Sequence, residues 1–253
     1  MGDLGELPWL IGLHDDFPSA AALAARVRHP VLLDPSPTAR LPVLALPAVA
    51  YGPMRAMLRV ARDPQLAAAM GDDYARLRCS AYYPYVWRFL GRAAVLVPLV
   101  ALATLDLARM FGPRVFVRSD TNFKLFTAEV HDAAAVAVLS ERHAIHADAL
   151  VVVSEVIAIT AEYRCFCHRG QFVCGSSYPA VPYAPVPAAM RAFAEEIAAA
   201  VAPLGLDPLT VDVAETPDGP RLVELGGVHA WGLYGSDPAA FVAMMEAAAR
   251  DRL

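Results

Sequence analysis

Two short apolar segments near the carboxy-terminal end each carry a single carboxylate. Residues 210–214 contain Asp212 and residues 221–225 contain Glu224, with the sequence Pro217-Asp218-Gly219 between them. Proline, aspartate and glycine in succession favour a tight turn, and the β-branched residues on either side favour strands. The sequence therefore predicts a β-hairpin in which Asp212 lies opposite Glu224, because the two are equidistant from Asp218.

Facing carboxylates constrain the chemistry of this hairpin. Opposed side chains in a hairpin have Cβ atoms about 4.5–5.5 Å apart. Two charges at that separation repel each other unless a proton or a cation intervenes. A shared Mg²⁺ would remove the conflict, since it prefers carboxylate oxygens and leaves room for phosphate. Two alternatives remain at this point: carboxylates on a solvated face, and an acid/base pair as in glycosidases.

A cationic loop favours the metal interpretation over the glycosidase one. Residues 115–117 predict a short buried strand, and the polar residues 119–123 follow it between Arg118 and Lys124. Arginine binds oxygens in a bidentate manner and lysine acts as a point charge, so the loop suits a polyphosphate. It lacks the glycine spacing of a P-loop, and plain surface charge is the alternative.

Further acidic residues occur in apolar surroundings. Residues 150–159 predict a strand that contains Glu155, and an unpaired buried carboxylate is costly. Glu155 is therefore expected to face water or to hold a ligand. Glu162 and Arg164 follow at a spacing of two, which places them on one face of a strand. A salt bridge between them is the structural alternative to a ligand site.

The remaining pattern indicates an α+β protein with mainly antiparallel pairing. Residues 163–168 and 171–176 flank Arg169-Gly170 as a hairpin would, and Pro187 opens an amphipathic helix. The proline-rich residues 1–65 predict a small α/β lobe. The aromatic residues 82–87 interrupt a helical pattern and predict a packed aromatic patch.

Composition restricts the class of protein. The formal net charge is −5, so a mainly electrostatic nucleic-acid binder is not expected. The longest apolar run covers residues 93–105, which is shorter than the roughly 20 residues of a membrane-spanning helix. The amino terminus lacks a basic segment followed by an apolar one, so we expect a cytoplasmic protein without a membrane association.

The four cysteines are expected to be free thiols rather than a disulfide framework. They are Cys79, Cys165, Cys167 and Cys174. A zinc site formed by Cys165, Cys167, His168 and Cys174 is an alternative, but strand alternation places His168 on the face opposite Cys165 and Cys167. Zinc needs four convergent ligands, so this alternative is disfavoured.

Taken together, these segments resemble the ATP-grasp superfamily of carboxylate–amine ligases, and most closely its compact single-chain branch. The resemblance covers the chain from about Cys79 to the end and rests on residues 115–127, 153–156, 161–164, 211–213, 221–225 and 232–235. It implies two α+β lobes with mainly antiparallel sheets that enclose ATP, plus a small amino-terminal α/β lobe. The corresponding divisions are residues 1–75 and 76–253, the latter with lobes of about 76–150 and 151–253.

The resemblance also implies a role for each candidate residue. Adenine would lie against Val153, Ser154, Glu155 and Val156, with Glu155 or Glu162 near the ribose. Arg118 and Lys124 would contact phosphates, Asp212 and Glu224 would bind Mg²⁺, and Arg164 and His229 would hold the substrate carboxylate or phosphate. Arg118, Lys124 and Arg164 would assist catalysis by neutralising charge.

The function so implied is ATP- and Mg²⁺-dependent activation of a carboxylate as an acyl phosphate, which an amine or another nucleophile attacks. The substrate would be a small molecule or a peptide with a carboxylate, and a homodimer is left open. The family usually has asparagine two residues after the second metal carboxylate, where this chain has Gly226. A degenerate ATP-binding module that serves a partner protein, and a phosphotransferase on the same fold, are therefore the alternatives.

Overall fold

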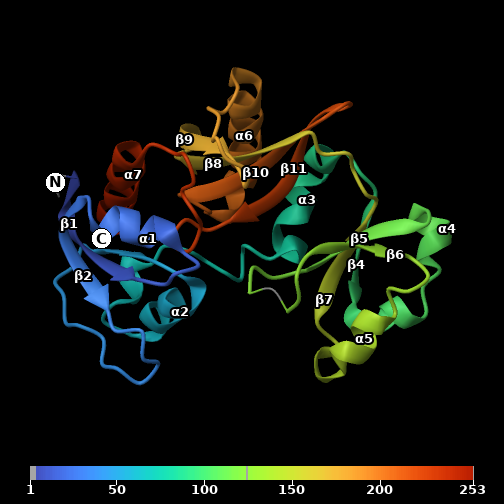
Figure 1. Ribbon diagram of the computed structural model, residues 1–253, viewed down its shortest axis with the longest axis horizontal. Coiled ribbons are helices and arrows are strands. Elements are labelled where there is room, and N and C mark those ends of the chain that lie inside the picture. The colour runs from blue at the N-terminus through green and yellow to red at the C-terminus, as the bar shows by residue number, and fades with distance from the viewer. Residues whose placement is uncertain (1–3, 124, 253) are drawn as a thin grey trace.

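Short β-branched segments in three parts of the chain form three separate sheets. The computed structural model describes residues 4–123 and 125–252. The three sheets lie along the long axis of the molecule, with the amino-terminal sheet at one end and the sheet containing β5 at the other (Figure 1). The four-stranded sheet that contains the predicted hairpin lies between them.

The amino-terminal sheet is parallel and small. Its strand order is β2-β1-β3, and its elements are β1 (Leu4–Gly12), α1 (Pro18–Ala24), β2 (Val27–Leu33), β3 (Val49–Tyr51) and α2 (Met54–Arg62). Parallel neighbours need a crossover connection, and α1 supplies the one between β1 and β2. The predicted α/β lobe is therefore confirmed.

The carboxy-terminal helix α7 (Pro238–Asp251) belongs to the core of this lobe, although it is far away in sequence. Its Glu246 is 3 % exposed, and the carboxylate accepts hydrogen bonds from the Glu6 and Leu7 backbone amides and from Trp9 Nε1. The lobe is thus attached to the end of the chain as well as to its own elements. The division at residues 75 and 76 remains a proposal.

The second sheet is antiparallel, with strand order β4-β7-β5-β6. Its strands are β4 (Ala94–Pro98), β5 (Arg114–Ser119), β6 (Glu129–Asp132) and β7 (Leu150–Ser154). Short helices α4 (Leu107–Phe111) and α5 (Val138–Arg142) accompany this sheet, and residues 99–107 and 136–139 pack with it into one core. The strand predicted for residues 150–159 ends at Ser154, because the following residues leave the sheet to line a cavity.

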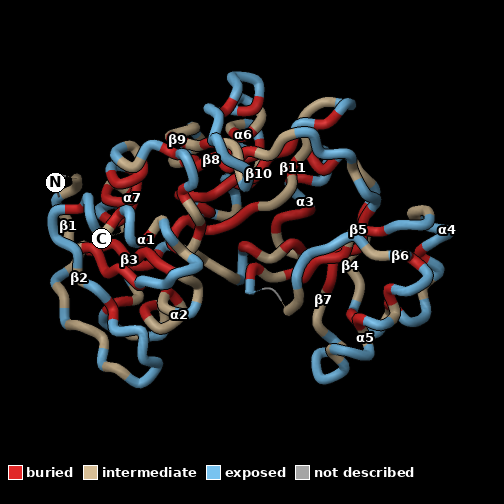
Figure 2. The backbone as a smooth tube through the Cα atoms, viewed as in Figure 1, coloured by how far each residue is buried: buried red, intermediate tan, exposed pale blue. Residues whose placement is uncertain are grey.

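The third sheet is also antiparallel and is covered on both faces. Its order is β11-β10-β8-β9, with β8 (Ala161–His168), β9 (Gln171–Ser177), β10 (Leu209–Thr216) and β11 (Gly219–Gly226). Helices α3 (Cys79–Leu90) and α6 (Ala188–Val201) pack on one face, and α7 packs on the other. Figure 2 shows the resulting band of buried backbone through this sheet.

The predicted turns and pairings of this sheet are confirmed. Asp212 pairs with Glu224 across β10 and β11. Arg169 and Gly170 both have positive φ, at 51° and 73°, as a two-residue hairpin turn with matching twist requires. Pro187 precedes the first residue of α6 as predicted.

The prediction that the aromatic cluster interrupts a helix is wrong. Residues 82–87 continue helix α3, with Pro84 inside it. Tyr82, Tyr83 and Val86 are buried at helical spacing against the third sheet, and this packing outweighs the cost of an internal proline. Within residues 4–123 and 125–252, no helix has the length and apolarity that crossing a membrane requires.

Candidate functional site

Two cavities meet at the hairpin formed by β10 and β11. The larger has a volume of about 950 Å³ and extends between the third sheet and the amino-terminal lobe. The smaller has a volume of about 310 Å³ and extends between the third and second sheets. Glu162, Val223 and Glu224 line both cavities. A β-bulge next to the Asp212–Glu224 pair leaves Val223 without a register partner, as bulges near functional sites often do.

The smaller cavity is an apolar slot with a polar inner end. Its apolar lining comes from β5, β6 and the segment after β7, with Phe116, Phe126, Val130, Val156, Ile157 and Ile159 among its residues. Glu155 and Val156 line it, as expected for the adenine segment. Val153 and Ser154 do not: both are fully buried, and Val153 packs in the core of the second sheet. The slot therefore starts one residue after the strand ends.

Arg118 and Glu224 form an ion pair at the inner end of this slot. Arg118 lies on β5 and is 6 % exposed, and its Nη2 donates to Glu224 Oε1 on the neighbouring sheet. Its Nη1 donates to the Val223 carbonyl at 3.3 Å. Burial alone would lower the pKa of Arg118, but the Glu224 carboxylate raises it, so the guanidinium stays charged. Lys124, predicted to act beside Arg118, lies outside the described residues.

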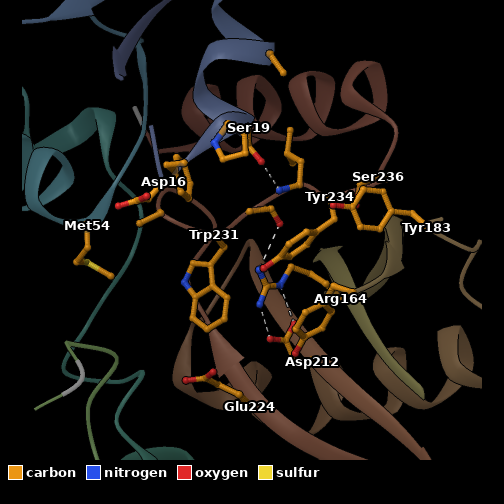
Figure 3. Close-up of a pocket in the computed structure, with 18 of the residues that line it drawn as sticks. Asp16, Ser19, Met54, Arg164, Tyr183, Asp212, Glu224, Trp231, Tyr234 and Ser236 are labelled. Atoms are coloured by element: carbon orange, nitrogen blue, oxygen red, sulfur yellow. Dashed lines mark hydrogen bonds and ion pairs between the residues drawn. The ribbon is translucent and has the colours of Figure 1, made fainter. Parts of the chain in front are cut away.

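Arg164 and Asp212 form a second ion pair in the wall of the larger cavity. Arg164 Nε and Nη2 donate to the two Asp212 oxygens at 2.9 and 2.7 Å. The guanidinium lies over the rings of Tyr178, Trp231 and Tyr234, with its carbon 4.6, 4.7 and 5.1 Å from their centroids (Figure 3). Although burial opposes the charge, Asp212 raises the pKa of Arg164.

These two pairs change the interpretation of the facing carboxylates. Asp212 and Glu224 pair in the predicted register, but each carboxylate is neutralised by its own arginine. The expected uncompensated repulsion is therefore wrong for the protein without ligand. The alternative salt bridge between Glu162 and Arg164 is also not formed, since Arg164 pairs with Asp212.

Glu162 lies where the two cavities meet. Its carboxylate accepts a hydrogen bond from the Tyr178 hydroxyl, and burial raises its pKa in spite of that bond. It is thus available to a ligand in either cavity.

His229 does not face either cavity. It is fully buried, its Nε2 accepts from the Gly71 amide at 2.9 Å, and its Nδ1 lies 2.6 Å from the Ala50 carbonyl. Because Nε2 accepts, Nδ1 carries the proton, and burial lowers the pKa so that the ring is neutral. The predicted substrate contact is corrected: His229 joins the loop after β11 to the amino-terminal lobe.

Sequence reasoning missed the contribution of the amino-terminal lobe. Asp16, Ser19, Arg26 and Met54 line the larger cavity across from the third sheet (Figure 3). The Ser19 hydroxyl accepts from the Leu233 amide at 2.9 Å and so attaches α1 to the loop of residues 227–237. No local motif marks these residues, because their role depends only on how the lobes pack.

The hairpin cysteines do not converge on a metal. Cys165 and Cys167 pack in the core on one face of the third sheet, whereas Cys174 packs in the core on the other face. Burial raises the pKa of Cys167 and of Cys174 to about 12. Among the residues that the structure describes, no three histidine, cysteine or acidic side chains gather closely enough to hold an ion.

The carboxylate oxygens nevertheless fit a hard cation that also takes ligands from a nucleotide. Each Asp212 oxygen accepts one hydrogen bond and keeps a second lone pair. Glu224 Oε2 accepts from no described residue, and both side chains line the larger cavity. This donor set, two carboxylates with open positions, suits Mg²⁺ bound together with phosphate oxygens.

Comparisons with known proteins agree with this geometry. A family model of the ATP-grasp domain, the second family of its clade, matches residues 89–244. No curated protein matches the chain significantly. Three solved structures illustrate its fold neighbours. D-cycloserine synthetase DcsG has a TM-score of 0.65 at 15 % identity, with 97 % of this chain and 99 % of that one covered.

The second neighbour is the ATP-grasp ligase PsnB with a phosphomimetic variant of its minimal precursor, Mg and ADP, with a TM-score of 0.61, 13 % identity and coverage of 96 % and 99 %. The third is D-alanine–D-alanine ligase from Bacillus anthracis with ATP, with a TM-score of 0.61, 12 % identity and coverage of 97 % and 98 %. At these identities the structures show the fold alone. The family match covers more than half of the sequence, and the chain therefore belongs to this clade of the ATP-grasp domain family.

Proposed function

We propose that the protein is an ATP- and Mg²⁺-dependent ligase that activates a carboxylate as an acyl phosphate for attack by an amine or another nucleophile. The observation that carries this proposal is the junction of the two cavities at Glu162, Val223 and Glu224. A nucleotide in the smaller cavity and a substrate in the larger one would meet beside the carboxylates of the hairpin. Two reactants held next to each other are the main requirement of phosphoryl transfer.

The smaller cavity suits the nucleoside. Its volume of about 310 Å³ and its apolar walls are those of a small-molecule site with few polar groups. The base would lie against Glu155 and Val156, the ribose near Glu162, and the phosphates near Arg118. Lys124 remains a proposed phosphate contact on the same loop.

Asp212 and Glu224 are the residues that would hold Mg²⁺. When bound, the ion neutralises the charge on the phosphate oxygens. Arg118 and Arg164 already orient these two carboxylates in the protein without ligand. The proposed substrate contact of Arg164 is restricted by this pairing, and its remaining Nη1 donates to the Gly232 carbonyl at 3.3 Å.

The proposed reaction has two steps. A substrate carboxylate oxygen attacks the γ-phosphorus, and the bond to ADP breaks. The nucleophile then attacks the acyl carbon, phosphate leaves with the carbon–oxygen bond, and the nucleophile loses its proton. The larger cavity of about 950 Å³ has room for a small molecule or the end of a peptide. Among the fold neighbours, one holds a precursor peptide and another is a D-alanine–D-alanine ligase, so both kinds of substrate are candidates.

Two alternatives share the fold. Gly226 favours a degenerate nucleotide-binding module, because the usual asparagine is missing. A phosphotransferase would stop at the phosphorylated product.

Release of ADP in the presence of paired carboxylates and amines tests the proposal. The ligase requires both substrates for continued release of ADP and phosphate, and mass spectrometry detects the joined product. The phosphotransferase releases ADP with one substrate and keeps the phosphate on it. Binding of MgATP without any substrate-dependent ADP release, across a broad screen, would instead support the module.

A further inference from the structure

The place of the missing asparagine is filled by an aromatic ring. A Cβ added to Gly226 would lie 2.0 Å from Cζ2 of Trp231, far inside contact distance. Trp231 is held there by its packing on Arg164. No side chain fits at residue 226 unless the indole moves, so an oxygen for the metal cannot come from this position.

Another amide lies beside the hairpin, on the opposite lobe. Asn122, in the loop after β5, is 8 % exposed and lines the larger cavity together with Asp212 and Glu224. Its Nδ2 donates to the carbonyl of Leu225 at 3.3 Å, between Glu224 and Gly226. Since a carbonyl only accepts, the nitrogen must face Leu225 and the oxygen must face away from it.

That oxygen is unused in the protein without ligand. Asn122 Oδ1 is buried, and no described residue donates a hydrogen bond to it. A buried acceptor without a donor costs free energy, so such a group in a folded protein needs an explanation. A cation-binding role explains why an amide is present here, where an apolar side chain would otherwise be less costly.

We propose that Asn122 Oδ1 is the third protein oxygen for Mg²⁺ beside Asp212 and Glu224, in place of the side chain that Gly226 lacks. Amide carbonyl oxygens are regular ligands of hard cations. The inference rests on the proposed function, because it assumes the same metal site.

The proposal makes the metal site span two lobes. Asp212 and Glu224 belong to the third sheet, whereas Asn122 follows β5 of the second sheet. Its loop is anchored by Asp120, whose carboxylate accepts from the Ser80 amide and from Arg78 Nε at the start of α3. The position of Asn122 is thus set by the fold and not by the metal.

Titration with Mn²⁺ in the presence of ADP tests the proposal without reference to activity. The free Mn²⁺ signal in electron paramagnetic resonance gives the dissociation constant of the ion for wild type, Asn122→Ala and Asn122→Asp. Asn122→Ala removes the oxygen, and we expect binding at least about tenfold weaker. Asn122→Asp keeps an oxygen of the same reach and adds a charge, so binding should be at least as tight as in wild type.

The outcomes separate this inference from the proposed function. Equal Mn²⁺ affinity in wild type and Asn122→Ala would overturn the inference and leave the proposed function intact. Equal weakening in both variants would also overturn it, because that pattern belongs to loss of the hydrogen bond to Leu225. Absence of ADP-dependent Mn²⁺ binding in wild type would reject both. Melting curves without ligand confirm folding, and Asn122→Ser replaces Asn122→Ala if the latter is unfolded.

Discussion

The two facing carboxylates of the hairpin are paired in different ways. Asp212 is held by Arg164 from β8, the neighbouring strand of the same sheet. Glu224 is held by Arg118 from β5, which belongs to another sheet. The first pair is bidentate and enclosed by three aromatic rings, whereas the second uses one guanidinium nitrogen and lies where the two cavities meet.

This difference separates a rigid part of the site from an adjustable one. Arg164 and Asp212 move together, because their strands are joined by backbone hydrogen bonds. Arg118 and Glu224 are joined mainly by side chains across two lobes, so a nucleotide that draws Arg118 towards phosphate alters only this contact. We infer that the Arg164–Asp212 pair maintains the third sheet and that the Arg118–Glu224 pair responds to ligands.

Removal of Asp212 should produce the largest loss of stability. In Asp212→Ala the buried guanidinium of Arg164 has no counter-ion, and we expect the free energy of unfolding to fall by about 3–5 kcal/mol. Urea denaturation measures the change. The exposed pair of Arg169 and Asp251 is a matched control, and Asp251→Ala should cost less than about 1 kcal/mol. Similar losses in both variants would show that the Arg164–Asp212 pair has no special structural role.

Substitution of Glu224 should cost less stability but more ligand binding. In Glu224→Gln the amide oxygen still accepts from Arg118, so the free energy of unfolding should fall by only about 1–2 kcal/mol. The loss of charge at the proposed metal site should weaken binding of MgATP, which raises the melting temperature of wild type by mass action. Calorimetric titration and melting curves measure the two effects. If Glu224→Gln is as unstable as Asp212→Ala and keeps the full MgATP shift, the distinction between the two pairs is wrong.

His229 allows a third, smaller test on the rigid side of the site. Its folded pKa is lowered by burial below the unfolded value of 6.5. As the pH falls below 6.5, the unfolded chain gains a proton that the folded one does not, so stability decreases. The decrease is about 1.4 kcal/mol per pH unit until the folded pKa is reached.

The variant His229→Gln does not titrate, and its amide oxygen still accepts from the Gly71 amide. Urea denaturation at pH 7.5 and at pH 5.5 should therefore show a larger decrease for wild type than for the variant. Other groups titrate equally in both proteins, so the difference reports on His229. Identical pH dependence would mean that His229 is protonated in the folded protein.

The register of the hairpin could be predicted from the sequence, because it depends only on strand alternation and on a turn at Asp218. The arginine partners could not, since Arg164 and Arg118 are 48 and 106 residues away from the carboxylates they bind. The local surroundings of both arginines identify them as site residues in the sequence. Their counter-ions depend on how strands and lobes pack.

The same limit explains the other differences. His229 looks like a catalytic side chain in the sequence, and only the packing of Gly71 and Ala50 around it shows that it is structural. Ser19 and Arg26 belong to a lobe without any motif, yet they line the larger cavity. The aromatic residues of α3 form a helix because the third sheet buries one side of them.

The hairpin thiols provide the smallest expected effect and a check on the rigid side. Cys165 follows Arg164 on β8, and it pairs with Val211, which precedes Asp212. If this strand pair is a scaffold without a metal of its own, conservative changes of its cysteines should leave nucleotide binding unchanged. Cys167→Ala and Cys174→Ala should therefore keep the wild-type dissociation constant for MgATP, as measured by calorimetry.

Thiol labelling of the folded protein makes the same argument at the level of single atoms. With a pKa of about 12, only about one Cys167 or Cys174 thiol in 10⁴ is ionised at pH 8, and both are buried. Alkylation should therefore be slow until urea unfolds the chain, and mass spectrometry then counts the labelled cysteines. Bound zinc also blocks alkylation, so metal analysis of the purified protein is the necessary control. Stoichiometric zinc that is released together with the thiols would place a metal on the third sheet, and Arg164 and Asp212 could no longer be treated as a scaffold free of metal.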